Sequence, residues 1–194
     1  MISDFKNKTA VITGAGSGFG LECARIGAAL GMNLVLADVQ QDALDRAAAE
    51  MTAAGAPVLA MRVDVSKADQ VEALGAATLA RFGAPNFVFN NAGVGAPPVP
   101  LDELTIEQWR NVVDINLNGM FYCLQQAFVA MKAQSPQGGR IINNGSISAY
   151  APRPNSIAYT ATKHAVTGLT KTAALDGRKY GIAVGQIDIG SLDQ

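Results

Sequence analysis

A glycine-rich turn near the amino terminus limits the possible folds of this chain more than any other segment. The sequence TGAGSGFG at 13–20 follows the β-branched run KTAVIT at 8–13, and a helical pattern begins at once. Gly14 fits a tight turn, while Gly18 and Gly20 let backbone approach a pyrophosphate and let the helix pack near the strand. The turn therefore predicts the strand, loop and helix that open a dinucleotide-binding unit.

The rest of the chain alternates short β-branched runs with longer helical stretches, a pattern typical of parallel strands joined by right-handed crossovers. Continuous apolar runs, such as residues 10–12, indicate strands covered by helices on both faces. We therefore expect one domain, 1–194, of the α/β class: a doubly wound, three-layer sheet of Rossmann type with strand order 3-2-1-4-5-6. Strands are expected at 8–13, 33–37, 57–63, 86–90, 139–144 and 182–187, and helices at 18–31, 41–54, 67–82, 105–133 and 155–180.

Composition argues against several other classes of protein. The 194 residues are 49% hydrophobic, which suffices for one core, and the net charge of −1 comes without a basic stripe, so no nucleic-acid partner is expected. No apolar run approaches the roughly 18 residues of a membrane span, so we expect no membrane partner and a cytoplasmic location. Cys23, Cys123 and His164 lack neighbours that could complete a metal site, so no metal is expected.

Asp38 ends the second expected strand, 18 residues past Gly20 (38 − 20). A carboxylate there can accept hydrogen bonds from both hydroxyls of the adenosine ribose. It would repel a 2′-phosphate, and neither Ser17 nor Val39 supplies an offsetting cation, so the sequence favours NAD over NADP. The alternative is a carboxylate that caps the following helix.

Tyr159 and Lys163 stand four residues apart in YTATKHAV, so on a helix they share one face. Loss of a hydride from a carbinol carbon requires a base for the hydroxyl proton, and phenols, with an ordinary pKa of about 10, are poor bases near neutrality. An ammonium on the same helix face favours phenolate, and an oxidised nicotinamide adds to this effect. The pair therefore suits acid/base chemistry beside a nicotinamide.

Further signatures accompany this pair and the glycine turn. They are Asp64 at the end of the third strand, NNAG at 90–93, Asn116 in DINLNG, and Ser146, thirteen residues before Tyr159. From about residue 5 to 190 the chain resembles the short-chain dehydrogenase/reductase family. The resemblance implies a catalytic tetrad of Asn116, Ser146, Tyr159 and Lys163. It also implies an NAD site formed by Gly14, Ser17, Gly18, Phe19, Gly20, Asp38, Asp64, Val65, Asn91, Ala92, Gly93, Tyr159, Lys163 and Ile189, with Asp64 and Val65 at the adenine.

The activity that the resemblance implies is hydride transfer between nicotinamide and a secondary alcohol or ketone, with Tyr159 as general acid/base. Ser146 would hydrogen-bond the substrate oxygen, although Ser148 is a nearby competitor. Asn116 would fix a water that links Lys163 to solvent; judged from the residues alone, it could equally be a capping or packing residue.

Two segments depart from the family pattern. Ile189 stands where relatives commonly have proline, at a backbone position that normally meets the nicotinamide carboxamide, and a backbone contact could survive this change. Relatives also usually continue into a substrate-covering segment and a seventh strand. Because the sixth strand would otherwise be an unprotected sheet edge, we expect either further residues after Gln194 or an oligomer partner over that edge, and favour the former.

The substrate pocket and the partners are less constrained. A mainly apolar pocket is expected from Val94, Gly95, Ile147, Ala149, Tyr150 and Pro152, for a small alcohol or carbonyl substrate. Residues 112–131 carry more apolar positions than one core-facing stripe uses. Either this helix is thoroughly buried or it has a second buried face, and the resemblance implies a homodimer or homotetramer there.

Two other functions are alternatives to hydride transfer. One is a non-catalytic dinucleotide-binding sensor or scaffold that lacks a complete substrate pocket. The other is a site for a different nucleotide such as a flavin, which is disfavoured because it leaves Ser146, Tyr159 and Lys163 unexplained.

Overall fold

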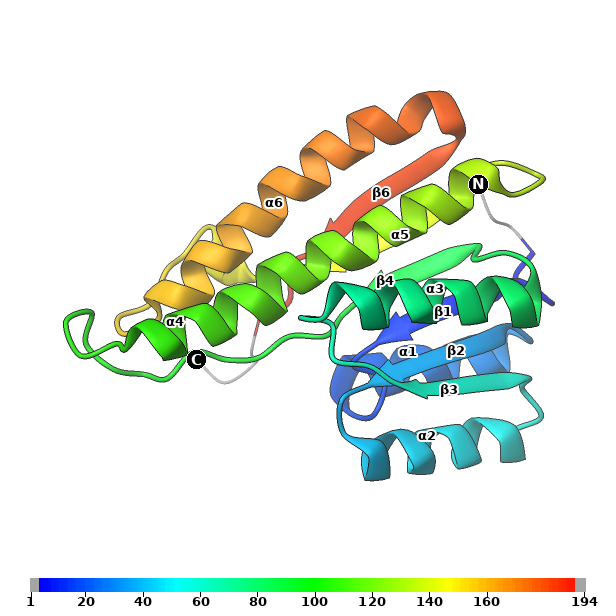
Figure 1. The fold of residues 1–194 in the computed structure, drawn as a ribbon, viewed down its shortest axis with the longest axis horizontal. Coiled ribbons are helices and arrows are strands. Elements are labelled where there is room, and N and C mark those ends of the chain that lie inside the picture. The colour runs from blue at the N-terminus through cyan, green and yellow to red at the C-terminus, as the bar shows by residue number, and fades with distance from the viewer. Residues whose placement is uncertain (1–3, 191–194) are drawn as a thin grey trace.

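Six parallel strands form one sheet within residues 4–190, the part of the chain that the computed structural model describes (Figure 1). They are β1 (Thr9–Thr13), β2 (Asn33–Asp38), β3 (Val58–Arg62), β4 (Phe87–Asn90), β5 (Gly139–Asn144) and β6 (Ile182–Ile187). Their order is β3-β2-β1-β4-β5-β6, which confirms the predicted doubly wound topology. The winding reverses between β1 and β4, where open α/β sheets bind their ligands. The prediction about residues after Gln194 lies outside the described range.

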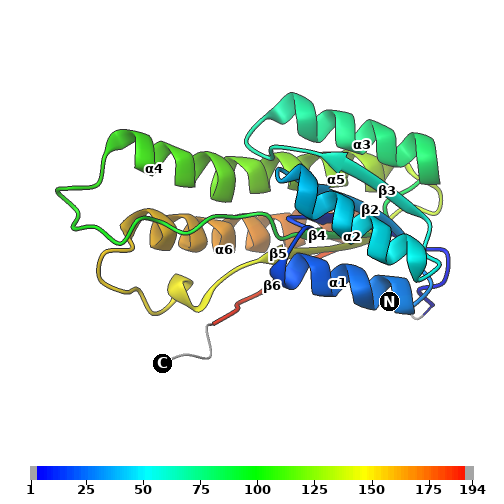
Figure 2. The same cartoon turned by 90° about the horizontal axis from the view of Figure 1, so that it is seen from below.

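Helices cover both faces of this sheet (Figure 2). They are α1 (Gly18–Ala29), α2 (Gln41–Ala53), α3 (Ala68–Phe82), α4 (Ile106–Val113), α5 (Met120–Ala133) and α6 (Ile157–Gly177), with the π-helical segment η1 (Asp114–Gly119) and the 3-10 turns η2 (Ile147–Ala149) and η3 (Arg178–Tyr180). Helices α1 and α2 pack on one face, and α3, α5 and α6 pack on the other. None of the described helices combines the length and the apolar character that a membrane crossing requires.

The core consists of two clusters because successive side chains of a strand point to opposite faces. Ile12 of β1 packs with Leu44 and Met51 of α2, whereas Val11 packs with Leu74 of α3 and Met131 of α5. Both faces of the central strands are therefore buried against helices. This explains why β1 is a continuous apolar run rather than an alternating one.

The predicted helix at 105–133 is interrupted in its middle by the π-helical segment η1. A Cβ on Gly119, its last residue, would lie 2.8 Å from the Val65 side chain, so glycine is needed where this segment crosses the loop after β3. The wider turn changes which side chains face inward and buries Asn116, which is 1% exposed. Apolar periodicity does not reveal such a segment, because it predicts α-helix throughout.

Helix α4 and the first turns of α6 project beyond the carboxyl ends of the strands (Figures 1 and 2). The connections after β4 and β5 lead to these two helices, and η1 packs against α6. The ends of β4 and β5 are therefore flanked by α6 and by the loops that follow these two strands.

The glycine turn packs as its sequence predicted. Gly14 has a φ of +63° and Gly18 a φ of +51°, left-handed values that favour glycine. A Cβ on Gly20 would lie 2.1 Å from the carbonyl oxygen of Gly14, so a side chain there would force the turn open.

We therefore expect Gly20→Ala to destabilise the fold by about 1–3 kcal/mol through overpacking against backbone. Gly168→Ala is the matched control, because Gly168 is exposed within α6 and a Cβ there would meet nothing within 4 Å. This control should gain about 0.5–1 kcal/mol, since alanine loses less backbone entropy in a helix. Urea denaturation measures both changes, and a Gly20→Ala protein as stable as the parent would contradict the packing argument.

Candidate active site

A cavity of about 580 Å³ lies at the carboxyl ends of β4 and β5. It is lined by Asn91, Gly93, Val94, Gly95, Ala96, Pro98, Asn144, Arg153, Pro154, Asn155, Ser156, Tyr159 and Lys163. The structure thus brings Tyr159 and Lys163 of α6 to the NNAG loop after β4. The two side chains, which the sequence predicted to share one helix face, thus line the same cavity.

Lys163 lines the cavity but is buried, with 5% of its surface exposed. Its Nζ donates a 2.7 Å hydrogen bond to the carbonyl oxygen of Asn144 and lies 5.5 Å from the centre of the Tyr159 ring. Burial lowers the pKa of Lys163 to about 8, and the charge of Asp188 partly opposes this shift. At neutral pH the side chain is therefore mainly an ammonium, one turn from the tyrosine.

Asn91 joins this cavity to the glycine turn. Its Nδ2 lies 3.1 Å from the carbonyl oxygen of Thr13 and 3.2 Å from that of Gly14, and its Oδ1 accepts a hydrogen bond from Asn144. The hydroxyl of Thr13 accepts the backbone N–H groups of Asn91 and Ala92 at 3.0 and 3.1 Å. Thr13 was not among the predicted site residues, although a threonine that ends β1, next to the point where the winding reverses, was a usable signal.

Ser146 begins the turn η2 and is buried. Its N–H donates to Asp188, and its hydroxyl accepts the N–H of Ser148 at 3.1 Å, which leaves the hydroxyl proton available for a substrate oxygen. The competitor Ser148 is also buried, and its hydroxyl has no hydrogen-bond partner among the described residues. Neither serine is among the residues that line the cavity.

The side-chain contacts of Asn116 differ from those that the resemblance implied. Its Oδ1 accepts the N–H of Val94 and its Nδ2 donates to the carbonyl oxygen of Val94, both at 2.8 Å. Because both polar atoms of the amide are taken up by this backbone, the side chain positions the loop after β4. The expected water link between Lys163 and solvent stays a prediction.

Asp38 closes the glycine turn onto β2. Its Oδ2 accepts the N–H of Gly16 at 2.8 Å, and its Oδ1 accepts the N–H of Gln40 at 2.9 Å. A Cβ on Gly16 would lie 3.0 Å from the Asp38 carboxylate, so this glycine, which the sequence analysis passed over, belongs to the cradle. Gln40 is itself the N-cap of α2, so the alternative of Asp38 as that helix's cap is not what the structure shows.

A cation near Asp38 was also missed. Arg62 is the register partner of Asp38 in the β2–β3 pairing, and its Nε donates to the Val39 carbonyl oxygen at 3.0 Å. Parallel pairing brings together residues that are 24 positions apart (62 − 38), which the local motif could not show. The sequence argument considered only Ser17 and Val39 as possible sources of a cation and so overlooked Arg62.

The remaining predicted cofactor residues surround the same edge of the sheet. Ser17 and Phe19 are exposed at the start of α1, and the Asp64 carboxylate accepts the N–H and hydroxyl of Ser66. Val65 is buried against Gly119, and the carbonyl oxygen of Ile189 accepts the N–H of Ile147 at 3.3 Å. The backbone contact expected of Ile189 with a cofactor stays a prediction.

A chain of polar side chains holds Ser146 in place. Asn90, Asn143, Thr170, Gln186 and Asp188 are linked in that order, with hydrogen bonds of 2.9, 2.9, 3.2 and 2.5 Å, and Asp188 accepts the N–H of Ser146 at 3.1 Å. The chain connects β4, β5, α6 and the end of β6. Polar residues at the ends of three expected strands were a signal that the sequence analysis did not use.

The expected apolar pocket is wrong. Val94 and Gly95 do line the cavity, but amide, guanidinium, hydroxyl and ammonium side chains line it beside them. Pro152 belongs to a neighbouring cavity of about 230 Å³, and Ile147, Ala149 and Tyr150 line neither. The prediction failed because polar residues from two loops, from the end of β5 and from α6 converge on one space.

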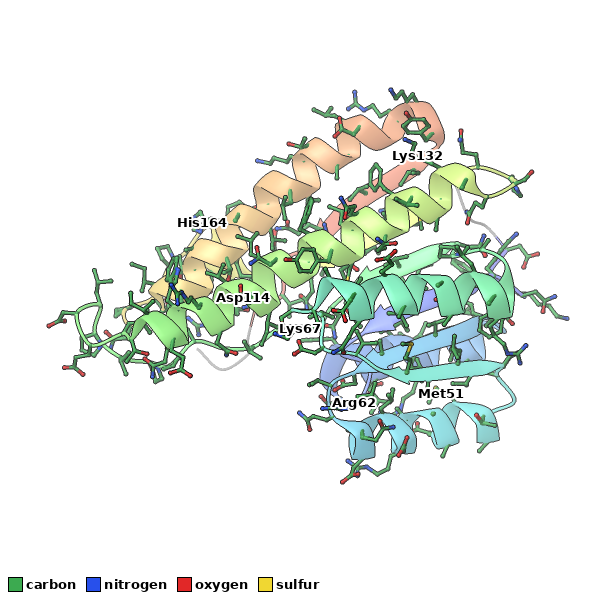
Figure 3. All side chains as sticks on the ribbon, viewed as in Figure 1. Met51, Arg62, Lys67, Asp114, Lys132 and His164 are labelled. Carbon is green, nitrogen blue, oxygen red and sulfur yellow. The ribbon has the colours of Figure 1, made fainter. Side chains whose placement is uncertain are left out.

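No cluster of three or more histidine, cysteine or acidic side chains suited to a metal ion occurs between residues 4 and 190. His164 lies on an exposed part of α6, with its Nδ1 2.9 Å from the Thr160 carbonyl oxygen (Figure 3). Cys23 and Cys123 are free thiols, and burial raises the pKa of both, that of Cys123 to about 12. These thiols are therefore protonated at neutral pH.

Comparisons with known proteins identify the family of this chain. A family model described as short chain dehydrogenase matches residues 8–193. Cyclohexanol dehydrogenase of Acinetobacter sp. (strain SE19) is 37% identical over 190 residues, and the match covers 98% of this chain and 75% of that protein. A 2,5-dichloro-2,5-cyclohexadiene-1,4-diol dehydrogenase of Sphingobium indicum is 36% identical over 191 residues, with the same two coverages.

Solved structures also resemble this chain in fold and in sequence. The crystal structure of a short chain dehydrogenase/reductase from Burkholderia phymatum in complex with NAD superposes with a TM-score of 0.89 at 42% identity. That match covers 95% of this chain and 65% of the solved chain. The present chain thus spans about two thirds to three quarters of the lengths of these proteins.

The low pKa of Lys163 makes stability depend on pH. The folded protein loses the Lys163 proton near pH 8 and the unfolded chain near its ordinary value of 10.5, so the unfolded chain holds more protons in between. The free energy of unfolding should therefore rise between these values, by up to about 3 kcal/mol at roughly 1.4 kcal/mol per pH unit.

Urea denaturation across this pH range, on the parent and on Lys163→Met, isolates the contribution. The variant should lack the increase, because it has no ammonium to discharge. Parallel pH profiles of the two proteins would show that burial does not shift the pKa of Lys163.

Proposed function

The chain belongs to the short chain dehydrogenase family, and from that premise we propose that Tyr159 is the general acid/base of NAD-dependent hydride transfer between a cyclic secondary alcohol and its ketone. The observation that carries the proposal is the meeting of Tyr159 and Lys163 with Asn91 and Gly93 in one cavity. The protein is an NAD-dependent oxidoreductase of alcohols and ketones. The alternative function, a non-catalytic sensor, is disfavoured because two relatives of this chain are named for dehydrogenase activity.

The residues at the switch point fit a dinucleotide. The turn at 14–20 leaves no room for a Cβ at Gly16 or Gly20, so backbone N–H groups can come close to a pyrophosphate. Asp38, beside this turn, has carboxylate lone pairs left over for ribose hydroxyls. When bound, the nicotinamide supplies hydride transfer to and from the carbinol carbon.

The protein's own side chains handle the proton and the substrate oxygen. In the oxidation, the phenolic oxygen of Tyr159 takes the proton of the substrate hydroxyl, and in the reduction it returns that proton. The Lys163 ammonium favours the phenolate, and the Ser146 hydroxyl donates a hydrogen bond to the substrate oxygen as its charge changes. Asn116 holds the Val94 backbone and so fixes one wall of the cavity.

The ring-alcohol substrate class is supported by the names of two relatives, which act on cyclohexanol and on a cyclohexadienediol. A polar cavity wall around Tyr159 suits a substrate that carries oxygen atoms. The direction of the reaction follows from metabolite concentrations and not from the site.

We further propose a homodimer or homotetramer that uses α5 and α6. Phe121 and Val129 of α5 are 44% and 59% exposed, so this helix is not thoroughly buried in a single chain. Phe121, Phe128 and Leu169 line a cavity of about 280 Å³ between the two helices. A second buried face therefore accounts for the apolar excess of residues 112–131. A cytoplasmic location stays a prediction from the sequence.

Tyr159→Phe should reduce the rate of NADH formation from cyclohexanol by roughly 10²- to 10⁴-fold, because the proton of the substrate hydroxyl loses its acceptor. The dissociation constant of NADH, followed by fluorescence, should change less than about twofold, since the ring remains. Tyr180→Phe, at the opposite end of α6, is the control and should retain the parent rate. Parent-like activity of Tyr159→Phe would remove this residue from the mechanism.

Asp38→Ser should weaken NADH binding by about tenfold or more through loss of charge-assisted hydrogen bonds to the ribose. Binding of NADPH should strengthen, because the like charge is removed while Arg62 stays beside the site. Calorimetric titration with both cofactors checks this, with the exposed Asp42→Ser on α2 as control. An unchanged ratio of the two affinities would argue against a ribose contact.

A further inference from the structure

The exposed Arg153 lies on the wall of the cavity beside Tyr159, and neither the proposed hydride transfer nor the proposed cofactor contacts involve it. Arg153 lines both the 580 Å³ cavity and the neighbouring 230 Å³ cavity, so it stands at their boundary. Within residues 4–190 the salt bridges all belong to Arg25, so Arg153 has no carboxylate partner there. No aspartate or glutamate lines either cavity.

The loop that carries Arg153 is restricted before any ligand binds. Pro152 and Pro154 flank it; each has a fixed φ, and Pro154 also disfavours a helical conformation of Arg153 itself. The hydroxyl of Ser156 donates a 2.6 Å hydrogen bond to the Arg153 carbonyl oxygen and lies 2.9 Å from the hydroxyl of Thr160 on α6. The backbone at Arg153 is thus anchored to the helix that carries Tyr159, and a ligand would order only the side chain.

The charges around this space favour an anion. Lys163 and Arg153 are the two cations on the cavity wall, and Lys163 already donates to the Asn144 carbonyl oxygen below Tyr159. The guanidinium of Arg153 therefore remains for a ligand, and its planar fork of N–H donors matches a carboxylate in a bidentate pair. A cofactor pyrophosphate belongs instead to the glycine turn at 14–20, whose residues do not line this cavity.

The side cavity supplies the apolar complement. Val99, Leu101 and Ile157 line it next to Arg153, and Leu101 is among the exposed large apolar side chains. A ligand that bridges the two cavities would place an apolar body against these residues, an anionic group at Arg153 and a hydroxyl at Tyr159.

We propose that Arg153 binds a carboxylate group of the substrate, so that the preferred substrates are hydroxy acids whose alcohol is secondary and whose body is an apolar ring. This inference rests on the proposed function and narrows it. Arg153 is then a specificity-determining residue that takes no part in proton or hydride transfer.

The test compares two isosteric alcohols, 4-hydroxycyclohexanecarboxylate and 4-hydroxycyclohexanecarboxamide, which differ in charge. The parent should oxidise the carboxylate with a kcat/KM about tenfold or more above that of the carboxamide. Arg153→Gln should lose this preference through a higher KM for the carboxylate, with the carboxamide changed less than about threefold, and Arg153→Lys should keep part of it. Arg178→Gln, an exposed arginine at the other end of α6, is the control.

A binding measurement separates this inference from the proposed function. Calorimetric titration of the carboxylate into the complex of protein and NADH should show an affinity that falls about tenfold or more in Arg153→Gln, while NADH affinity stays unchanged. If neither alcohol is oxidised but this dependence holds, the proposed function fails and the anion site stands. Three results would each overturn the inference. They are an equal loss of kcat/KM for the carboxylate and the carboxamide in Arg153→Gln, weaker NADH binding in that variant, and carboxylate affinity that is unchanged in it.

Discussion

The close approach of two loops at the centre of the sheet is the constraint on which the rest of this structure depends. The turn after β1 and the loop after β4 meet where the winding reverses, and Asn91 and Thr13 bridge them through side chain to backbone hydrogen bonds. A Cβ on Gly14 would lie 3.0 Å from the Ala92 backbone, so this contact needs glycine. Because β1 and β4 are neighbours in the sheet, the same contact sets the distance between the glycine turn and the cavity that holds Tyr159.

A buried ammonium is the main electrostatic cost of this arrangement. Lys163 has its Nζ against one carbonyl oxygen and no carboxylate within ion-pair distance among the described residues, so burial dominates and lowers its pKa. A stable fold gains nothing from such a group, whereas a phenol that must carry a proton to and from substrate benefits from a neighbouring cation. The lysine is therefore better explained by chemistry than by stability. Asp188 contributes to both residues: its charge favours the protonated form of Lys163, and its carboxylate accepts the N–H of Ser146.

The polar groups of the site are held by partners distant in sequence. Asn116 reaches Val94 from a π-helical segment, and Ser146 is fixed by an aspartate 42 residues further along the chain. Asn116 and Val94 lie within the connection from β4 to β5, whereas Asp188 reaches Ser146 from beyond the crossover through α6. These hydrogen bonds hold the site on the side of β5, β6 and α6, and the loop that carries Arg153 is anchored to α6 through Ser156.

The sequence by itself determined the strand order, the placement of the glycine turn and the shared helix face of Tyr159 and Lys163, because each depends on spacing over a few residues or on alternation of strands and helices. It also gave the residues at the strand ends, since parallel strands bring those ends to one edge. Only the tertiary structure decided that Asn116 holds a backbone segment, that Arg62 lies beside Asp38, and that the cavity is polar, with an Arg153 that has no carboxylate partner among residues 4–190. Those features depend on strand register, on a local change of helix type and on how loops far apart in the chain converge, and periodicity carries no information about any of the three.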